Sequence, residues 1–258
     1  MKILICIKQV PDTEAKPVLR EDGTGFFYDN SRTAFRINRF DEYALEEALL
    51  LKDAQPDIIV DAVSAGTAAV VPSLRRALEM GADSAFLLAA GPDTPLQGTA
   101  AAHCIAAFAY SRGYDLIFTG VMSEDDMRGV TGPALGALLD YSWATSAVRQ
   151  TPDVERGIII VERELDAVTR EHLTLRLPAV LTVQSGINRP RYPSLTNKLR
   201  AKALDIPEIT VDMSRVHLTE RTMAVRHSGS KGTGIIIEGN TREKADTLRS
   251  MLHGKSLL

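Results

Sequence analysis

The sequence predicts an α/β fold in which helices cover both faces of a mostly parallel sheet. Through the first half of the chain, short aliphatic and β-branched runs alternate with segments of helical periodicity, a pattern typical of this class. The 258 residues suffice for one large domain with an appendage, and 45% of them are hydrophobic, enough for a substantial core. This composition excludes collagen-like, coiled-coil and wholly disordered chains.

Four strands are expected in the first half, and each is followed by a helix. The expected strands are Lys2–Lys8, Ile58–Gly66, Ser84–Ala90 and Tyr114–Gly120. The expected helices are Asp41–Lys52, Pro72–Met80, Pro95–Arg112 and Pro133–Asp140. Acidic residues open the first helix, where the helix dipole favours negative charge. Gly81 and Gly113 follow the second and third helices as stop signals.

The second half has a different pattern. Gly157–Leu165 and Arg170–Leu177 predict an antiparallel hairpin, and Pro178–Gly186 predicts a further strand, so this group should form an edge or extension of the sheet. From Ile187 to Arg226 prolines and charges dominate and periodicity is weak, which indicates an arm. A final strand, Gly234–Gly239, and a helix, Thr241–Leu252, close the chain. We therefore divide it into an α/β domain, 1–186, and an arm, 187–258.

Charge is unevenly distributed along the chain. Residues 1–185 hold 17 basic and 26 acidic side chains, whereas residues 186–258 hold 13 basic and 7 acidic ones. The basic tail contains one aromatic residue, Tyr192, and no recognisable nucleic-acid motif. We therefore expect a protein partner and no nucleic acid.

The cysteines and the first residues bear on the compartment. Cys6 and Cys104 form no Cys-x-x-Cys pair, which argues against a disulfide framework or a structural zinc site. The first apolar run is short and is followed at once by Lys8, so it does not resemble a signal peptide. The uncharged stretch Thr94–Ser111 is interpreted as a buried helix. We expect a cytoplasmic protein without direct membrane insertion.

Side-chain catalysis is poorly supported. The Gly232–Gly234 segment lacks the third glycine of a dinucleotide fingerprint, and His253–Ser256 lacks the first glycine of a P-loop. The five histidines show no ligand spacing, and consecutive helical residues such as His103 and Cys104 point about 100° apart. We expect neither catalytic residues nor a metal site.

The loops after the strands are the best candidates for a ligand site. In open parallel sheets, ligands lie beyond the carboxyl ends of the strands, where helix N-termini offer free amides to anions. These ends are Cys6–Ile7, Ala65–Gly66 and Gly120–Thr131. At the last of them, Gly132 can act as N-cap and Pro133 fits the first helical position, so the next amides would face a phosphate.

The charged residues of the Gly120–Thr131 loop support two different interpretations. Arg128 supplies a cation for a phosphate, whereas Glu124, Asp125 and Asp126 would repel one but can accept hydrogen bonds from ribose or adenine. A solvated acidic loop followed by a well-capped helix explains the same residues equally well. Both interpretations remain open on the residues alone.

Several segments occur together in one order. They are the opening Lys2–Asp12, the Asn38–Glu42 entry into an acidic helix, Val63–Gly66, Met80–Asp83, the Asn188–Tyr192 block with Leu195, and Ala201–Lys202. Over about residues 1–205 the chain thereby resembles the beta subunit of electron-transfer flavoproteins. The resemblance implies a Rossmann-like nucleotide-binding domain and a larger alpha subunit that carries the redox FAD. It also implies electron transfer from acyl-CoA dehydrogenase-type flavoenzymes to a quinone reductase.

The resemblance also assigns residues. AMP would contact Cys6, Asn38, Arg39, Phe40, Asp41, Ala65, Gly120, Val121, Met122, Ser123, Glu124, Asp125, Asp126, Met127, Arg128, Gly129, Val130 and Thr131. Arg191, Tyr192 and Leu195 would bind a partner, with Leu195 as an apolar anchor for dehydrogenases; simple packing of a proline-flanked loop is the alternative for Leu195.

Three alternatives accompany this interpretation. Thr131 matches the AMP-binding branch, whereas Pro133 matches bifurcating relatives that hold a second FAD at this position and oxidise NADH. An adenylate-handling hydrolase of similar fold would need a Ser-Gly-Gly-x-Asp-Ser loop after the first strand, and Gln9–Asp12 does not resemble it. A nucleotide-free assembly scaffold is the third. We expect an electron carrier subunit, not a stand-alone enzyme.

Overall fold

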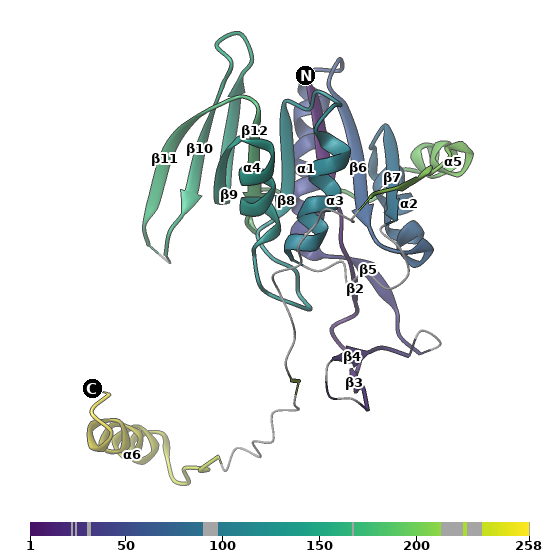
Figure 1. Cartoon of the computed structure of the whole chain (residues 1–258). Coiled ribbons are helices and arrows are strands. Elements are labelled where there is room, and N and C mark those ends of the chain that lie inside the picture. The colour runs from purple at the N-terminus through teal and green to yellow at the C-terminus, as the bar shows by residue number, and fades with distance from the viewer. Residues whose placement is uncertain are drawn as a thin grey trace.

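A computed structural model describes residues 1–21, 23, 25–29, 32–89, 98–166, 168–212, 224–225 and 234–257. Within these residues the main sheet has nine strands in the order β11-β10-β9-β12-β8-β1-β6-β7-β13 (Figure 1). In chain order they are β1 (Lys2–Cys6), β6 (Ile59–Ala65), β7 (Ser84–Ala89), β8 (Leu116–Gly120), β9 (Ser142–Asp153), β10 (Ile158–Glu164), β11 (Arg170–Arg176), β12 (Ala179–Val183) and β13 (Glu208–Thr210). In this sheet order, every neighbouring pair from β9 through β12, β8, β1, β6 and β7 to β13 is parallel. The pairs β9–β10 and β10–β11 are antiparallel. The predicted fold class is confirmed.

Helices cover both faces of the sheet. The helices α1 (Arg39–Ala54), α2 (Val71–Met80), α3 (Thr99–Ala109) and α4 (Thr131–Leu139) do so, α5 (Leu195–Ala203) lies beside α2, and α6 (Thr241–Gly254) follows near the end of the chain. The apolar residues of α1 and α2 belong to one buried cluster, and those of α3 and α4 belong to the other. In Figure 1, α3 and α4 lie in front of the sheet and α1 lies behind it.

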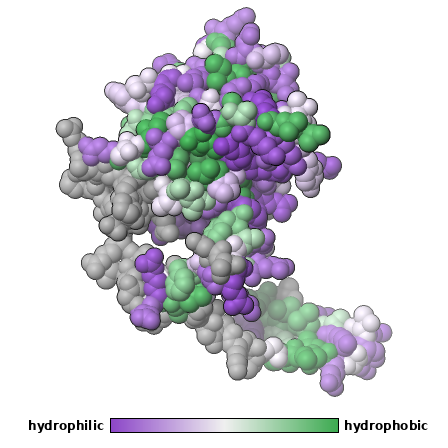
Figure 2. Space-filling model, turned by 90° about the vertical axis from the view of Figure 1, so that its right-hand side faces the viewer, coloured by the Kyte–Doolittle hydropathy of each residue, from purple (hydrophilic) through white to green (hydrophobic). Residues whose placement is uncertain are grey.

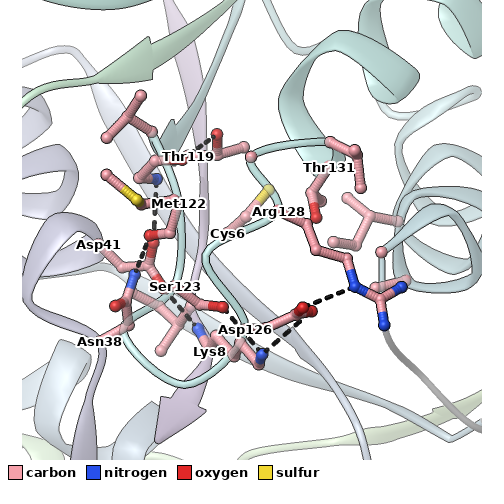
Figure 3. Close-up of a pocket in the computed structure, with 18 of the residues that line it drawn as sticks. Cys6, Lys8, Asn38, Asp41, Thr119, Met122, Ser123, Asp126, Arg128 and Thr131 are labelled. Carbon is pink, nitrogen blue, oxygen red and sulfur yellow. Dashed lines mark hydrogen bonds and ion pairs between the residues drawn. The ribbon is translucent and has the colours of Figure 1, made fainter. Parts of the chain in front are cut away.

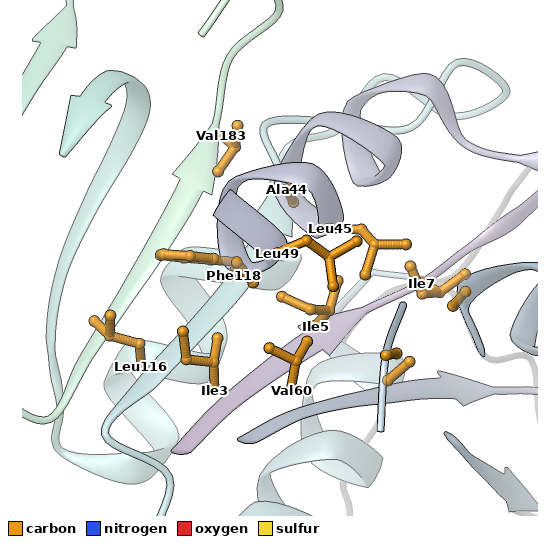
Figure 4. Packing of buried hydrophobic residues seen from close by; sticks show 14 of the residues in the cluster. Ile3, Ile5, Ile7, Ala44, Leu45, Leu49, Val60, Leu116, Phe118 and Val183 are labelled. Atoms are coloured by element: carbon orange, nitrogen blue, oxygen red, sulfur yellow. The ribbon is translucent and has the colours of Figure 1, made fainter. Parts of the chain in front are cut away.

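Strand β1 shows why two clusters form. Successive side chains of a strand point to opposite faces, and this strand is apolar at every central position. Ile3 and Ile5 contribute to the α1 cluster, and Leu4 contributes to the α3 cluster. Figure 4 shows Ile5 beside Leu45 and Leu49 of α1, and Ile3 between Leu116 and Val60. Burial on both faces makes β1 a central strand.

Two small hairpins connect β1 to α1. Strand β2 (Gln9–Pro11) pairs with β5 (Phe35–Ile37), and β3 (Val18–Leu19) pairs with β4 (Phe26–Phe27). The N–H of Asn38 then donates to the carbonyl of Lys8 across 2.9 Å. This pairing brings the start of α1 beside the end of β1, where the candidate site lies.

Most predicted elements agree with the structure within two or three residues, and four expectations need correction. Strand β12 is not at an edge: it lies between β9 and β8, and all five of its residues are buried. Strand β9, helix α5 and strand β13 were not predicted. Residues 234–239 form no strand, and Ile236 is 88% exposed there, because none of the strands in the described part of the chain pairs with them.

The fourth correction concerns α4. This helix begins at Thr131 with Val130 as its N-cap, so Gly132 is not the cap and Pro133 occupies the third helical position. A proline is tolerated there because the first four N–H groups of a helix have no intrahelical acceptor.

Some of the expected elements lie partly outside the residues that the structure describes. Pro95–Gln97 of one predicted helix, and residues 213–223, 226–233 and 258 of the predicted arm, lie outside the described residues. The described part of that helix is α3, which ends at Ala109, three residues before the predicted end. Helix α6 is confirmed, with a capping box formed by Asn240 and Glu243. No residue of α6 is buried, and it lies apart from the sheet in Figure 1. Among the described residues, no helix combines the length and apolar character needed to cross a membrane.

Candidate functional site

A pocket opens where β1, β6 and β8 end, between the starts of α3 and α4. It encloses about 690 Å³, a volume that extends into open solvent. Its walls include backbone and side chains from all five elements and from the loop after β8 (Figure 3). This is the edge at which open parallel sheets hold their ligands.

The structure brings most predicted contact residues to this pocket. Those that line it are Cys6, Asn38, Asp41, Ala65, Gly120, Val121, Met122, Ser123, Asp126, Arg128, Gly129, Val130 and Thr131. Those that do not line it are Arg39, Phe40, Glu124, Asp125 and Met127. The Met127 side chain is 68% exposed.

Ile7, which belongs to the predicted strand end Cys6–Ile7, also lines the pocket, and five lining residues were missed: Lys8, Gly98, Ala101, Ile105 and Thr119. Two signals could have found some of them. Lys8 is a cation just beyond the end of a buried parallel strand, and Gly98 is the N-cap of α3. Both positions belong to the carboxyl edge of the sheet.

One buried carboxylate joins two strand ends behind the pocket. Oδ2 of Asp41 accepts the N–H of Lys8 at 2.7 Å, and Oδ1 accepts the N–H of Gly120 at 2.9 Å. Burial raises the pKa of Asp41 to about 7, although these donors and the Lys8 charge oppose the rise. Asp41 therefore fixes the ends of β1 and β8 relative to α1.

Gly120 is required by this arrangement. A Cβ at this position would lie 2.5 Å from Oδ1 of Asp41 and 2.6 Å from Cβ of Phe40. No side chain can enter that space without moving the first turn of α1. Gly132 has a similar role, because a Cβ there would lie 2.2 Å from Cγ2 of Thr182 on β12.

Asn38 holds the loop after β8. Its Nδ2 donates to the carbonyl of Met122 at 2.9 Å, and its Oδ1 accepts the N–H of Glu124 at 3.1 Å. The Glu124 carboxylate in turn accepts from Arg36 at 3.1 Å and from the N–H of Arg39 at 3.3 Å. The Glu124 side chain thus joins the loop to β5 and α1.

The pocket rim carries paired charges. Nζ of Lys8 lies 2.7 Å from Oδ1 of Asp125 and donates to Oγ of Ser123 at 3.0 Å. Nε of Arg128 lies 2.7 Å from Oδ1 of Asp126. Both cations are thus held by the acidic loop at the mouth of the pocket, as Figure 3 shows for Lys8, Asp126 and Arg128.

Backbone and thiol complete the wall. Thr131 lies at the first helical position of α4, and its N–H has no intrahelical acceptor. This end of the helix favours negative charge. Burial, with a smaller contribution from Asp41, raises the pKa of the Cys6 thiol, which therefore stays protonated and unreactive.

The predicted partner residues lie elsewhere, near α1 and α5. Tyr192 is 91% exposed and Leu195 is 74% exposed. Arg191 is different, because its guanidinium binds Glu46 of α1, with 2.9 Å between Nη2 and Oε1. The three residues are close in the chain but have unlike environments.

Fold and site together define a class: an open α/β protein with a ligand-sized crevice at the carboxyl ends of its parallel strands. The family model for the electron transfer flavoprotein domain matches residues 26–214, more than half of the chain. The chain therefore belongs to the electron transfer flavoprotein family, and its similar relatives are beta subunits.

Three relatives illustrate the likeness. The mitochondrial electron transfer flavoprotein subunit beta of Arabidopsis thaliana is 32% identical, over 98% of this chain and 99% of its own. The subunit beta of Bradyrhizobium diazoefficiens is 36% identical, over 90% of both chains. The human subunit beta is 33% identical, over 92% of this chain and 93% of its own.

Proposed function

We propose that this chain is the beta subunit of an electron transfer flavoprotein, which holds AMP in the pocket and pairs with an alpha subunit that carries FAD. The observation that carries the proposal is the pocket at the ends of β1, β6 and β8, lined by most of the residues that the family resemblance assigns to AMP. The FAD supplies the one-electron and two-electron chemistry of the complex.

The pocket lining fits AMP at each part of the nucleotide. Ala65, Ala101 and Ile105 give an apolar wall against which a purine can lie. The start of α4 and the guanidinium of Arg128 suit a phosphate. Ser123 supplies a hydroxyl near the mouth for ribose. The site therefore holds AMP as a structural ligand, and its own side chains make and break no bonds.

A second FAD in the same pocket is the runner-up. Pro133 at the start of α4 favours it by the family resemblance, while Thr131 favours AMP. A bifurcating complex would contain two flavins for each heterodimer and would be reduced by NADH. The AMP-binding complex contains one flavin and is reduced by an acyl-CoA dehydrogenase.

The arm, 187–258, is proposed to hold the alpha subunit. Its last helix, α6, buries none of its residues on this chain, and Leu248 and Met251 are exposed. Ile235 and Ile236, which precede it, are also exposed. Apolar groups in such number on one segment are typical of a surface that a partner covers.

Leu195 and Tyr192 are proposed to dock acyl-CoA dehydrogenase-type flavoenzymes, which deliver electrons that the complex passes to a quinone reductase. Both side chains are exposed, and a large apolar or aromatic side chain is the usual centre of a docking interface. We propose a cytoplasmic location; the Arabidopsis thaliana relative is named as mitochondrial and the Bradyrhizobium diazoefficiens relative is not.

The test is to produce the chain together with its alpha subunit and to add a reduced acyl-CoA dehydrogenase. The flavin absorption of the complex should bleach, and NADH alone should have no effect. Bleaching by NADH with two flavins per heterodimer would instead support the bifurcating version. ATP hydrolysis by the purified chain would support the hydrolase alternative.

A further inference from the structure

The middle of α1 carries two buried acids that bind the same distant segment. The exposed fractions of Glu46 and Glu47 are 3% and 9%. Buried carboxylates require polar partners, because desolvation of an unpaired charge is costly. Glu46 binds Arg191, and Glu47 binds Asn188 and Gln150.

Arg191 is attached to Glu46 through backbone and side chain together. The backbone N–H of Arg191 donates to Oε2 at 3.0 Å. Nε donates to the same oxygen at 2.9 Å, and Nη2 donates to Oε1 at 2.9 Å. Nη2 also donates to Oδ2 of Asp53, about two turns beyond the acids, at 2.7 Å. A two-pronged guanidinium–carboxylate pair fixes orientation as well as distance.

Asn188 makes the second attachment. Its Nδ2 donates to Oε2 of Glu47 at 2.8 Å and to the carbonyl of Tyr43 at 2.9 Å. The other oxygen of Glu47 accepts from Nε2 of Gln150 on β9 at 3.0 Å. The segment that leaves β12 is thus attached to α1 immediately before its exposed part begins.

A second attachment lies at the far end of the exposed part. Arg200 of α5 donates from Nη2 to the carbonyls of Leu78 and Ala82, at 2.9 and 2.8 Å. Arg75 of α2 donates to the carbonyls of Ala201 and Leu204. Residues 192–199 are therefore held at both ends by arginines.

The held segment presents an apolar patch, which consists of Tyr192, Leu195 and Leu199. Their exposed fractions are 91%, 74% and 60%. Leu195 and Leu199 share one face of α5, because residues four apart on a helix are neighbours. Figure 2 faces this side of the molecule, where green side chains interrupt a mostly purple surface.

Basic residues surround this patch. Arg189, Lys198 and Lys202 are exposed within the same stretch of chain. An apolar patch with a basic rim complements an apolar pocket with an acidic rim. The patch would therefore fit a partner that presents an apolar pocket with an acidic rim.

We propose that Arg191 is a positioning residue: held by Glu46, it presets the patch of Tyr192, Leu195 and Leu199 for docking to the flavoenzyme. This inference rests on the proposed function. Presetting increases affinity because the loop loses less freedom when the partner binds. The proposal gives Arg191 a different role from Tyr192 and Leu195. The guanidinium of Arg191 is bound to α1, whereas Tyr192 and Leu195 would contact the partner.

The test uses the alpha–beta complex and a double-mutant cycle of Arg191→Met and Leu195→Ala. Electron transfer from reduced acyl-CoA dehydrogenase is measured against the concentration of the complex, to give KM and kcat. Arg191→Met should raise KM about tenfold with kcat within about twofold. The double variant should be less than about twofold worse than Leu195→Ala alone, because both changes disable one patch.

Two further variants keep the result interpretable. Arg163→Met removes an arginine with a 2.6 Å ion pair to Glu171, on the distant β10–β11 hairpin, and should leave KM unchanged. Arg191→Lys keeps the charge but loses the two-pronged geometry, and it should also raise KM. This variant replaces Arg191→Met in the test if Arg191→Met does not fold. Hydrogen exchange at the amides of residues 192–199 should rise in both Arg191 variants.

Each result has one meaning. If Leu195→Ala leaves KM unchanged, the docking proposal itself is wrong. If Leu195→Ala raises KM but the Arg191 variants do not, docking stands and the positioning role is overturned. If the two effects multiply fully in the double variant, Arg191 and Leu195 act independently, and the positioning role is again overturned.

Discussion

The carboxylate of Asp41 accepts a hydrogen bond from the backbone N–H of Gly120, with 2.9 Å between the two atoms and 79 positions between the residues. Asp41 lies in the first turn of α1, and Gly120 ends β8. The other oxygen of the same carboxylate binds the N–H of Lys8, just beyond β1. One buried side chain therefore sets the separation of two strand ends that line the pocket.

Gly120→Ala should disrupt this arrangement. The new methyl group would lie 2.5 Å from Oδ1 of Asp41, so either the carboxylate or the first turn of α1 must move. We expect a loss of about 1–3 kcal/mol in the free energy of unfolding, and a loss of bound nucleotide. Thermal unfolding and nucleotide content of the purified complex measure both.

Gly25→Ala is the matched control for this variant. Its added Cβ would meet only the side chain of Arg20, at 3.6 Å, which is an ordinary contact. It should leave nucleotide content unchanged. An equal loss of nucleotide in both variants would mean that the contact between Gly120 and Asp41 is not what shapes the pocket.

Stability should depend on pH through Asp41. Burial raises its pKa to about 7, above the value of the unfolded chain, so the folded state binds the proton more tightly. The stabilisation from this proton is complete at low pH and is lost as pH rises through about 7. Relative to Asp41→Asn, which cannot ionise, the free energy of unfolding should fall by about 1 kcal/mol or more between pH 5 and pH 8.

Urea unfolding of both proteins across that pH range makes the comparison. The difference between them isolates Asp41, because the other titrating groups are the same. A difference between the two proteins that stays constant from pH 5 to pH 8 would show that folding does not raise the pKa of Asp41.

Arg128→Met should weaken phosphate binding selectively. If the guanidinium contacts the phosphate, its removal should lower the affinity for AMP about tenfold and leave the affinity for adenosine unchanged. Calorimetric titration of the nucleotide-stripped complex gives both affinities. Arg149→Met, whose arginine side chain is 79% exposed on β9, serves as the control. Equal losses for AMP and adenosine would assign Arg128 a role in folding the loop instead.

The apolar face of α6 should be needed for the alpha subunit. Replacing Leu248 and Met251 by aspartate should raise the dissociation constant of the heterodimer more than tenfold, since each buried apolar side chain contributes about 1.5–3 kcal/mol. Sedimentation velocity of the mixed subunits measures this. Thr247→Asp adds a charge to the same helix and should have little effect. Unaltered assembly of the double variant would exclude α6 from the interface.

The sheet and its flanking helices could be predicted because their patterns are local. Strand β1 is apolar at every central position, and α1 repeats apolar residues at helical spacing behind Asp41. Helix α5 escaped prediction because Ala201 is its only residue described as buried. The position of β12 between β9 and β8 depends on which strands pair, and the order of strands along the chain does not reveal which strands pair.

The site could be predicted in part for the same reason. Strand ends locate the pocket, so Cys6, Ala65 and Gly120 were found. The ammonium of Lys8, in contrast, pairs with Asp125, which lies 117 residues further along the chain. Its place at the rim therefore follows from tertiary structure.

If the pocket holds AMP and the alpha subunit carries a redox FAD, the purified complex should contain both nucleotides. The most direct measurement is to denature the purified alpha–beta complex and to quantify every nucleotide released. We expect equal amounts of AMP and FAD, one of each per heterodimer. Two equivalents of FAD without AMP, or FAD with no further adenine nucleotide, would contradict it.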